Sequence, residues 1–306
     1  MRVALICNAD EEQRWLDALR DALPDDTVDL WREGAAPFDV AVVWAPPQRF
    51  FDQQSALRAV FILGAGVDAV LKLQLPTTLP LFRLHDAGMA AQMAEYVVAV
   101  TLGYYRDLDA YARDQLQERW QPRRPRQRAG WTVGIAGLGV MGQAAAAMLQ
   151  PWGFALRGWS RSGRAVPGVQ VYGGAAQWTE FLRGCDVLVN LLPLTEATRG
   201  ALNASAFALL RQGAYLVNAA RGAHVVDADL LAALDSGQLA CATLDVFASE
   251  PLPPGHPYWS HPQVRITPHI AARTLRREAV QQIAQGLTTL KGGGVPAGLI
   301  DRNLGY

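Results

Sequence analysis

Arg221 and His269, in the second half of the sequence, have side chains suited to binding and protonating a small oxygen-rich molecule. Arg221 follows the apolar segment 214–218, and its planar guanidinium group can hold a carboxylate and a carbonyl oxygen together. His269 follows the apolar segment 264–267, and its imidazole group can supply a proton because it titrates near neutral pH. The pair favours acid catalysis at a carbonyl group. The alternatives are a surface ion pair for the arginine and a structural role for the histidine.

The segment from Gly137 to Gly142 has the G-x-G-x-x-G spacing of a dinucleotide-binding turn. It lies between the predicted strand 131–136 and the predicted helix 144–149, where glycines allow a tight turn and a close approach of the pyrophosphate. The pyrophosphate is then expected at the amino terminus of the helix. The residues expected to contact the dinucleotide are Gly137, Gly139, Val140, Met141 and Gly142. A glycine-rich turn without a ligand is the alternative.

The residues about 20 positions after this motif indicate which nicotinamide dinucleotide is bound. An NAD-specific site has an acidic side chain there for the ribose 2′-hydroxyl group, whereas this chain has the carboxylate-free segment 159–164. Arg161 can make charge-assisted hydrogen bonds to a 2′-phosphate, and Ser160 can donate its hydroxyl group. The sequence therefore predicts NADPH as the cofactor, with NADH possible at lower efficiency. The alternative is that these side chains are solvated loop residues.

Two features of the first 100 residues indicate a place for an anionic substrate. The segment from Gly64 to Val67 follows the predicted strand 59–63, and its glycines let successive backbone N–H groups converge on a carboxylate. The expected contacts are Ala65, Gly66 and Val67, with an ordinary turn as the alternative. Trp44 ends the predicted strand 40–44, where its side chain either covers a small substrate or packs in the core.

Short apolar segments alternate with amphipathic segments along most of the chain, as in parallel sheets whose strands are connected by helices. We expect strands at 3–7, 40–44, 59–63, 79–84, 131–136, 154–159, 187–191, 214–218, 240–245 and 264–267. We expect helices at 12–23, 89–111, 144–149 and 274–290. The predicted fold class is therefore α/β with doubly wound parallel sheets.

The chain of 306 residues is about twice as long as a typical domain of roughly 150 residues, so two domains are expected. We predict that residues 1–98 and 271–306 form a substrate-binding domain and that residues 99–270 form the cofactor-binding domain. The long helix 89–111 is suited to linking them, and the segment after the last helix is expected to pack on the first domain.

The composition excludes several classes of function. Hydrophobic residues make up 50% and charged residues 18%, which is typical of a globular protein. Basic and acidic residues number 28 each, so no net positive charge attracts nucleic acid or an anionic membrane surface. The arginine-rich segment 119–128 is expected to be a solvated loop or a subunit contact; a nucleic-acid site is the alternative. No apolar run approaches the roughly 20 residues of a membrane span.

Lysine and cysteine usage narrows the remaining classes. The lysines, Lys72 and Lys291, fit neither a Walker A motif nor the Tyr-x-x-x-Lys pattern of short-chain dehydrogenases. The three cysteines are too few and too far apart for a disulfide framework or a zinc site, so no metal is expected. Their number is typical of the reducing cytoplasm, and residues 1–7 are too short an apolar run for a secretion signal.

Five motifs, taken in order, make the chain similar to the D-isomer-specific 2-hydroxyacid dehydrogenases, and most of all to their glyoxylate/hydroxypyruvate reductase branch. They are Gly64–Asp68, Gly137–Gly142, Asn218–Gly222, Leu244–Phe247 with Glu250–Leu252, and Thr267–His269. The resemblance spans nearly the whole chain. It implies a flavodoxin-like substrate domain, a Rossmann cofactor domain and an active-site cleft between them.

The resemblance also implies roles for individual residues. Arg221 orients the substrate and polarises its ketone, while Glu250 is the carboxylate partner of the proton donor His269. Asp245 hydrogen-bonds the nicotinamide carboxamide, with a helix or turn cap as its alternative role, and Ala219 contacts the cofactor. Formate dehydrogenases share the fold but have glutamine in place of the glutamate, so that activity is not expected.

The activity that the resemblance implies is NADPH-dependent reduction of small 2-oxo acids, namely glyoxylate to glycolate and hydroxypyruvate to D-glycerate. One alternative is an NAD-linked D-2-hydroxyacid dehydrogenase with another substrate. A second alternative is a dinucleotide-sensing corepressor without turnover. The resemblance further implies a cytoplasmic homodimer with a small-molecule substrate and no nucleic-acid or membrane partner.

Overall fold

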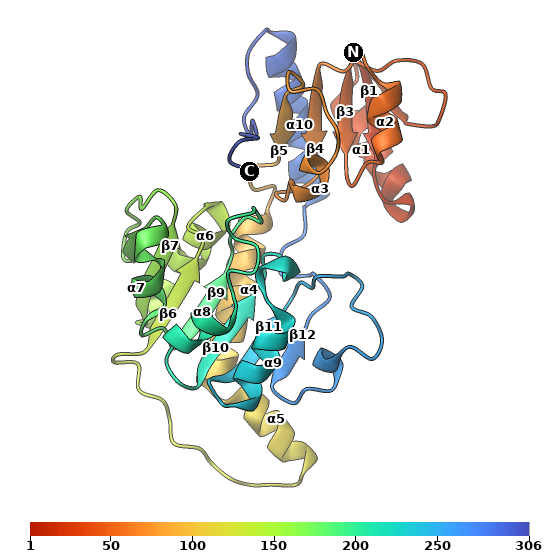
Figure 1. Cartoon of the computed structure of the whole chain (residues 1–306). Helices are drawn as coiled ribbons and strands as arrows, with labels where there is room; N and C mark the ends of the chain where they lie inside the picture. The colour runs from red at the N-terminus through yellow and green to blue at the C-terminus, as the bar shows by residue number, and fades with distance from the viewer. Residues whose placement is uncertain (306) are drawn as a thin grey trace. The chain divides into compact units, whose positions relative to one another are not determined.

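The computed structural model describes residues 1–305, which form two compact α/β units (Figure 1). The first unit comprises Met1–Met89 together with the segment from Thr274 onward, and the second comprises Ala90–Arg273. The sequence placed these limits at 98 and 270. The difference arises because α4 (Met89–Tyr105) is one helix whose buried side chains, among them Val97 and Val100, pack in the core of the second unit.

The first unit contains a five-stranded sheet with all neighbouring strands parallel. Its order is β2-β1-β3-β4-β5, which is the doubly wound flavodoxin-like order. The strands are β1 (Arg2–Ile6), β2 (Thr27–Leu30), β3 (Val40–Val43), β4 (Ala59–Ile62) and β5 (Leu81–Arg83). The helices are α1 (Glu12–Ala22), α2 (Gln48–Gln53), α3 (Asp68–Leu71) and α10 (Arg276–Lys291).

The carboxyl-terminal segment packs on the first unit. Backbone N–H groups of Arg83 and Ile300 donate to Gly298 and Leu81 at 2.9 Å each, so the segment runs antiparallel beside β5. Within the same unit, Arg276 of α10 pairs with Glu11 at 2.6 Å.

The second unit contains a seven-stranded parallel sheet in the order β12-β11-β10-β9-β6-β7-β8. The strand order reverses between β6 and β9, because β7 and β8 lie on one side of β6 and β9–β12 lie on the other. This is the Rossmann arrangement with one further strand, and the predicted fold class is confirmed. The strands are β6 (Thr132–Ala136), β7 (Ala155–Ser160), β8 (Gln170–Gly173), β9 (Val187–Asn190), β10 (Ala214–Asn218), β11 (Leu239–Leu244) and β12 (Val264–Ile266).

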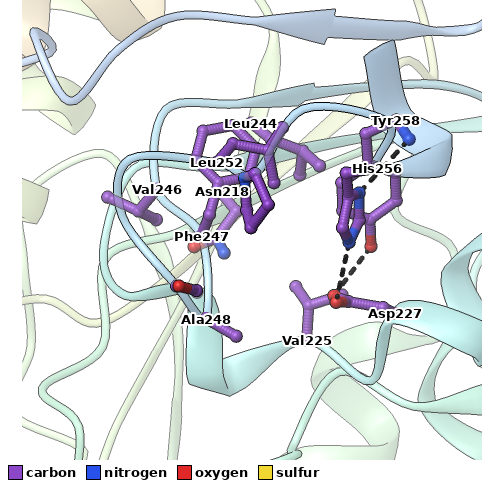
Figure 2. Close-up of a pocket in the computed structure, with 13 residues that line it drawn as sticks. Asn218, Val225, Asp227, Leu244, Val246, Phe247, Ala248, Leu252, His256 and Tyr258 are labelled. Carbon is purple, nitrogen blue, oxygen red and sulfur yellow. Dashed lines mark hydrogen bonds and ion pairs between the residues drawn. The ribbon is translucent and has the colours of Figure 1, made fainter. Parts of the chain in front are cut away.

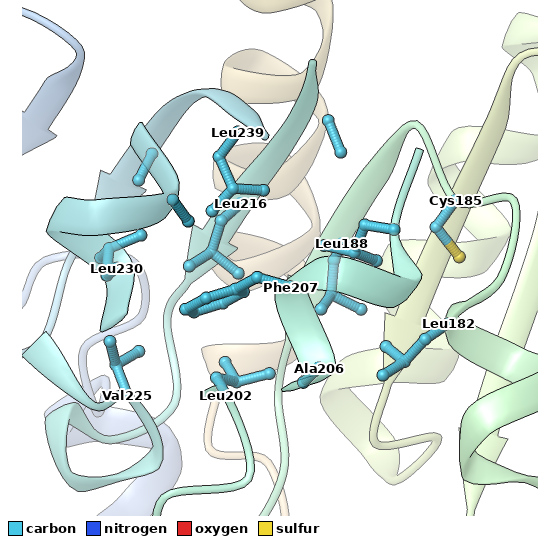
Figure 3. Packing of buried hydrophobic residues seen from close by; sticks show 14 of the residues in the cluster. Leu182, Cys185, Leu188, Leu202, Ala206, Phe207, Leu216, Val225, Leu230 and Leu239 are labelled. Atoms are coloured by element: carbon cyan, nitrogen blue, oxygen red, sulfur yellow. The ribbon is translucent and has the colours of Figure 1, made fainter. Parts of the chain in front are cut away.

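Helices cover both faces of this sheet, which explains why its central strands are continuously apolar. Side chains of β9 alternate between two cores: Leu188 packs with Phe207 of α8 (Ala204–Leu209) and Leu230 of α9 (Asp227–Asp235), as Figure 3 shows. Val187 and Val189 face the opposite core, which α4 and α6 (Val140–Leu149) cover.

The predicted helix 89–111 is interrupted. It ends at Tyr105 and a second helix, α5 (Leu108–Leu116), begins after Asp107. Asp107 takes the left-handed conformation with φ of 57°, and its carboxylate pairs with Arg126 at 2.8 Å. Among the described residues of this unit, the remaining α-helix is α7 (Trp178–Leu182), and the other helical segments are short 3-10 helices. Among residues 1–305, no helix has both the length and the apolar character that crossing a membrane requires.

Candidate functional site

The parallel sheet of the second unit brings the predicted residues to one edge. The glycine motif follows β6, Ser160 ends β7, and Arg221 lies shortly after β10. Asp245 follows β11 directly, and His269 comes shortly after β12. Because all these strands are parallel, their carboxyl ends lie at the same edge of the sheet, where doubly wound folds bind ligands.

In the glycine motif, two glycines leave no room for a side chain and a third faces open space, as dinucleotide binding requires. A Cβ atom at Gly137, whose φ is 104°, would lie 2.5 Å from the Leu191 carbonyl oxygen. A Cβ atom at Gly142 would lie 1.9 Å from the Gly137 oxygen, so the helix packs directly on the turn. At Gly139, which precedes the first residue of α6, a Cβ atom would meet nothing within 4 Å. The residues present therefore fit a pyrophosphate at this helix terminus.

The segment after β7 lies directly beside the glycine motif. Ala136 pairs with Trp159 in the sheet, and the Gly137 N–H group donates to the Trp159 oxygen at 2.9 Å. Ser160 Oγ accepts a hydrogen bond from the Gly163 N–H group at 3.2 Å and so shapes the turn, while its hydroxyl hydrogen stays available to donate. Arg161 is exposed at the start of this turn.

His269 and Glu250 contact each other directly. His269 Nδ1 lies 2.7 Å from Glu250 Oε2, and the other carboxylate oxygen accepts a hydrogen bond from the Phe247 N–H group at 2.9 Å. The histidine side chain is 44% exposed, and no residue among 1–305 is hydrogen-bonded to its Nε2 atom. One ring nitrogen therefore faces the carboxylate, while the described residues leave the other ring nitrogen without a hydrogen-bond partner.

A buried carboxylate holds the backbone of this histidine in an uncommon conformation. His269 has φ of 55°, in the left-handed region, and its N–H group donates to the Asp245 carbonyl oxygen at 2.9 Å. The Asp245 side chain accepts hydrogen bonds from Thr267 Oγ1 (2.6 Å), the Ile270 N–H group (2.9 Å) and the Ala271 N–H group (2.9 Å). Asp245 is 1% exposed, so water does not replace these bonds. Through these contacts the Asp245 side chain caps the turn that carries His269.

Buried polar side chains also fix the backbone of Arg221. Its carbonyl oxygen accepts a hydrogen bond from Asn218 Nδ2 at 3.1 Å and lies 3.1 Å from His224 Nδ1. Asn218 in turn accepts from Asn190 at 2.9 Å, and His224 Nε2 lies 3.3 Å from the Pro193 oxygen. His224 is fully buried, so its role here is structural.

Gly222 brings the segment of Arg221 against the segment of Glu250. A Cβ atom at Gly222 would lie 1.9 Å from the carbonyl carbon of Phe247 and 2.2 Å from the nitrogen of Ala248. Only glycine allows the two backbones to approach this closely. The guanidinium group and the carboxylate are thus carried by segments in direct contact.

The other predicted substrate residues belong to the first unit. The Trp44 ring packs on Gly64, where a Cβ atom would lie 2.6 Å from the ring, and the tryptophan is 39% exposed rather than in the core. The backbone N–H groups of Ala65, Gly66 and Val67 donate to no acceptor within residues 1–305. Three consecutive N–H groups are therefore available at the carboxyl end of β4.

A family model described as D-isomer specific 2-hydroxyacid dehydrogenase, NAD binding domain, matches residues 98–271. Glyoxylate/hydroxypyruvate reductase A of Serratia proteamaculans is 49% identical to the chain over 98% of its length and 97% of the relative. The chain belongs to the D-isomer-specific 2-hydroxyacid dehydrogenases. The resemblance found in the sequence is thereby confirmed, including the reductase branch.

Two solved 2-hydroxyacid dehydrogenase structures match the whole chain. A family member from Xanthobacter autotrophicus, in complex with NADPH and MES, has a TM-score of 0.94 and 40% identity, covering 99% of each chain. An NADPH-dependent glyoxylate/hydroxypyruvate reductase from Sinorhizobium meliloti, in complex with NADP and sulfate, has a TM-score of 0.94 and 37% identity, covering 100% of this chain and 99% of that one.

Tyr96 of this dehydrogenase is a supporting residue that the sequence did not single out. Its hydroxyl group lies 2.7 Å from Thr267 Oγ1, and because the threonine donates its own hydrogen to Asp245, the tyrosine is the donor. Burial raises the pKa of Tyr96 to about 12, so the tyrosine keeps its proton at neutral pH. Its distance of 171 residues from Thr267 in the chain explains why no local pattern could indicate the contact.

Neither a reactive cysteine nor a metal-binding cluster is found among the described residues of this dehydrogenase. Burial raises the pKa of Cys7 to about 11 and that of Cys185 and Cys241 to about 12, so none is a thiolate nucleophile at neutral pH. Within residues 1–305, no group of three or more His, Cys, Asp or Glu side chains is arranged to hold a metal ion.

We expect Asp245→Asn to lower the free energy of unfolding by about 2 kcal/mol, because an amide N–H₂ group would face a backbone donor in a buried place. Urea denaturation followed by tryptophan fluorescence measures the change. Asp229→Asn is the matched control: Asp229 accepts one backbone hydrogen bond, from Ala204 at 2.8 Å, in an exposed place, so a smaller loss is expected. Equal stability of Asp245→Asn and the wild type would contradict the buttressing role.

Proposed function

We propose that the protein catalyses NADPH-dependent reduction of small 2-oxo acids, glyoxylate to glycolate and hydroxypyruvate to D-glycerate. The observation that carries the proposal is the 2.7 Å contact between His269 Nδ1 and Glu250, at the same sheet edge as Arg221 and the glycine motif. Relatives named glyoxylate/hydroxypyruvate reductase A at 43–49% identity support the choice of substrate.

In the proposed reaction, bound NADPH supplies the hydride that reduces the carbonyl carbon of the 2-oxo acid. The Arg221 guanidinium group binds the substrate carboxylate and carbonyl oxygen and stabilises the negative charge that develops on that oxygen. His269 Nε2 donates its proton to the oxygen, and the Glu250 carboxylate stabilises the imidazolium form that precedes this transfer. The products are the 2-hydroxy acid and NADP⁺.

The first unit has proposed substrate contacts of its own. The backbone N–H groups of Ala65, Gly66 and Val67 are proposed to bind the substrate carboxylate, since none has an acceptor within the described chain. The half-exposed Trp44 ring, fixed on Gly64, is proposed to limit the length of the substrate side chain. A bulky ring at this place favours two- and three-carbon oxo acids over larger ones.

The proposed cofactor contacts follow the edge of the Rossmann sheet. Gly137, Gly139, Val140, Met141 and Gly142 surround the pyrophosphate, Ser160 and Arg161 bind the 2′-phosphate, and Ala219 and Asp245 lie toward the nicotinamide. The Xanthobacter and Sinorhizobium structures were obtained with NADPH and NADP, which supports NADPH over NADH. The limits 1–98 with 271–306 and 99–270 are kept as the proposed functional domains.

The second unit also carries an exposed apolar surface for which we propose a second copy of the chain as partner. Leu116 at the end of α5 is 87% exposed, and Trp120 in the loop that follows is 99% exposed. Figure 1 shows α5 and this loop extending from the body of the unit. A self-complementary contact through this arm would bury both side chains in a homodimer.

The three cysteines are all unpaired, which supports the cytoplasm as the compartment.

Arg221→Lys is expected to lower kcat/KM for hydroxypyruvate about 100-fold, because an ammonium group cannot reproduce two parallel charge-assisted bonds worth about 3 kcal/mol. Steady-state NADPH oxidation measures the loss, and NADPH binding followed by fluorescence is expected to stay unchanged. Retention of most of the wild-type kcat/KM would refute the proposed binding of the substrate by the Arg221 guanidinium group. Binding of NADPH by the wild type without any turnover would instead favour a dinucleotide sensor.

Arg161→Ala is expected to lower kcat/KM for NADPH between about 10-fold and 100-fold, through loss of a charge-assisted bond to the 2′-phosphate. NADH lacks that phosphate, so its kcat/KM serves as the internal control and is expected to change little. The measurement is a matrix of both cofactors against glyoxylate, hydroxypyruvate, pyruvate and phenylpyruvate. Equal kcat/KM of the wild type with NADH and NADPH would contradict the proposed preference for NADPH.

The wild type is expected to have twice the 33.2 kDa chain mass by light scattering. Trp120→Ser combined with Leu116→Ser is expected to weaken the dimer at least about 30-fold, since a central tryptophan contributes about 2 kcal/mol or more to an interface. Val295→Ser, which removes another apolar side chain that is 71% exposed but lies in the first unit, is the control. A monomeric wild type, or a dimer unaffected by the double substitution, would contradict the proposed surface.

A further inference from the structure

Three polar side chains of the second unit, Asp227, His256 and Tyr258, contact one another beside a small cavity (Figure 2). The Tyr258 hydroxyl group donates to Asp227 Oδ1 at 2.8 Å, and His256 Nε2 lies 3.6 Å from Asp227 Oδ2. The rings of His256 and Tyr258 are 4.6 Å apart. Each carboxylate oxygen therefore has its own partner, and both partners come from the segment that carries Glu250.

The cluster joins the same two segments that Gly222 brings together. Asp227 begins α9, shortly after Arg221, whereas His256 and Tyr258 follow Glu250. Between the backbone contact at Gly222 and the contacts of Asp227 lies a cavity of about 110 Å³. Because no side chain fills this space, packing alone does not fix the distance between the two segments. The polar contacts of Asp227 supply the second point of attachment.

The segment between Glu250 and Tyr258 has a restricted backbone at four of its positions, while Gly255 takes φ of 80°. It contains prolines at 251, 253, 254 and 257, whose rings fix φ and restrict the preceding residues. Tyr258 is 3% exposed, and burial together with the Asp227 charge raises the pKa of its hydroxyl group, so it remains a donor. A displacement at Tyr258 would therefore be passed along the segment to the Glu250 carboxylate.

We propose that Asp227, together with Tyr258 and His256, is a positioning cluster that holds the Glu250 carboxylate against His269. The inference rests on the proposed function, in which Glu250 stabilises the protonated imidazole. A purely structural role is the competing explanation, because Asp227 also lies in the first turn of α9, where an acidic side chain stabilises a helix. The two differ in whether the effect depends on Glu250.

The test is the pH dependence of kcat/KM for hydroxypyruvate in Tyr258→Phe, Glu250→Gln and the double variant. In the proposed reaction His269 must be protonated, so kcat/KM falls as pH rises. We call this fall the alkaline limb of the profile. A carboxylate that is misplaced or absent stabilises the protonated ring less, so the alkaline limb moves to lower pH. Tyr258→Phe is expected to lower kcat/KM about tenfold and to move the limb in this direction. In the double variant the effect of Tyr258→Phe is expected to disappear, because the carboxylate that it positions is gone.

Tyr104→Phe is the matched control, since it removes a hydroxyl-to-carbonyl bond of 2.9 Å to Gly213, at the amino end of β10 and away from the site. It is expected to leave the profile unchanged. His256→Asn removes the imidazole contacts with Asp227 and with the Tyr258 ring but leaves the Tyr258 side chain itself unchanged. It is expected to move the alkaline limb in the same direction, which keeps the test valid if Tyr258→Phe folds poorly.

The outcomes separate this inference from the proposed function. If Glu250→Gln moves the alkaline limb while neither Tyr258→Phe nor His256→Asn does, the positioning role of the cluster is refuted. The proposed proton relay, in which His269 donates the proton and Glu250 stabilises its protonated form, is then retained. If the losses of Tyr258→Phe and Glu250→Gln multiply in the double variant, the cluster is only structural. If Glu250→Gln itself leaves the profile unchanged, the relay fails and the positioning role fails with it.

Discussion

The carboxylate of Asp245 lies where the end of β11 meets the segment of His269, and the geometry of the site depends on it. Its two oxygens accept three hydrogen bonds in a buried place, where each is worth more than in water. The left-handed conformation of His269 costs on the order of 1–3 kcal/mol, and these bonds offset that cost. The direction of the imidazole, and hence its contact with Glu250, follows from this constraint.

The same principle extends to the other segments at this edge. The parallel strands fix where each segment starts, but a loop needs further contacts to hold a side chain in one place. Asn218 and His224 do so for the backbone of Arg221, and Gly222 brings that backbone against Phe247. Buried polar groups, rather than the exposed reactive side chains, therefore set the geometry of the candidate site.

Much of this arrangement was predictable from local sequence. The apolar runs 187–191 and 214–218 and the glycine motif gave the Rossmann sheet, because strand burial and tight turns leave strong local patterns. The strands β2 (TVDL) and β8 (QVYG) were missed because each contains only two apolar residues, so neither forms the continuous apolar run by which the other strands were predicted. The helix 89–111 was predicted without its break because the conformation of Asp107 depends on a distant arginine. The contacts of Tyr96 and Asp227 join residues far apart in sequence, so only the folded chain reveals them.

The most direct test of the account is a single-turnover experiment in which enzyme saturated with NADPH is mixed with hydroxypyruvate and NADPH fluorescence is followed. The wild type is predicted to oxidise the bound cofactor in one rapid phase. His269→Gln is predicted to bind NADPH with unchanged affinity and to oxidise it about 1,000-fold more slowly, the loss expected on removing a general acid. Oxidation by His269→Gln at the wild-type rate, or none by the wild type, would contradict the account.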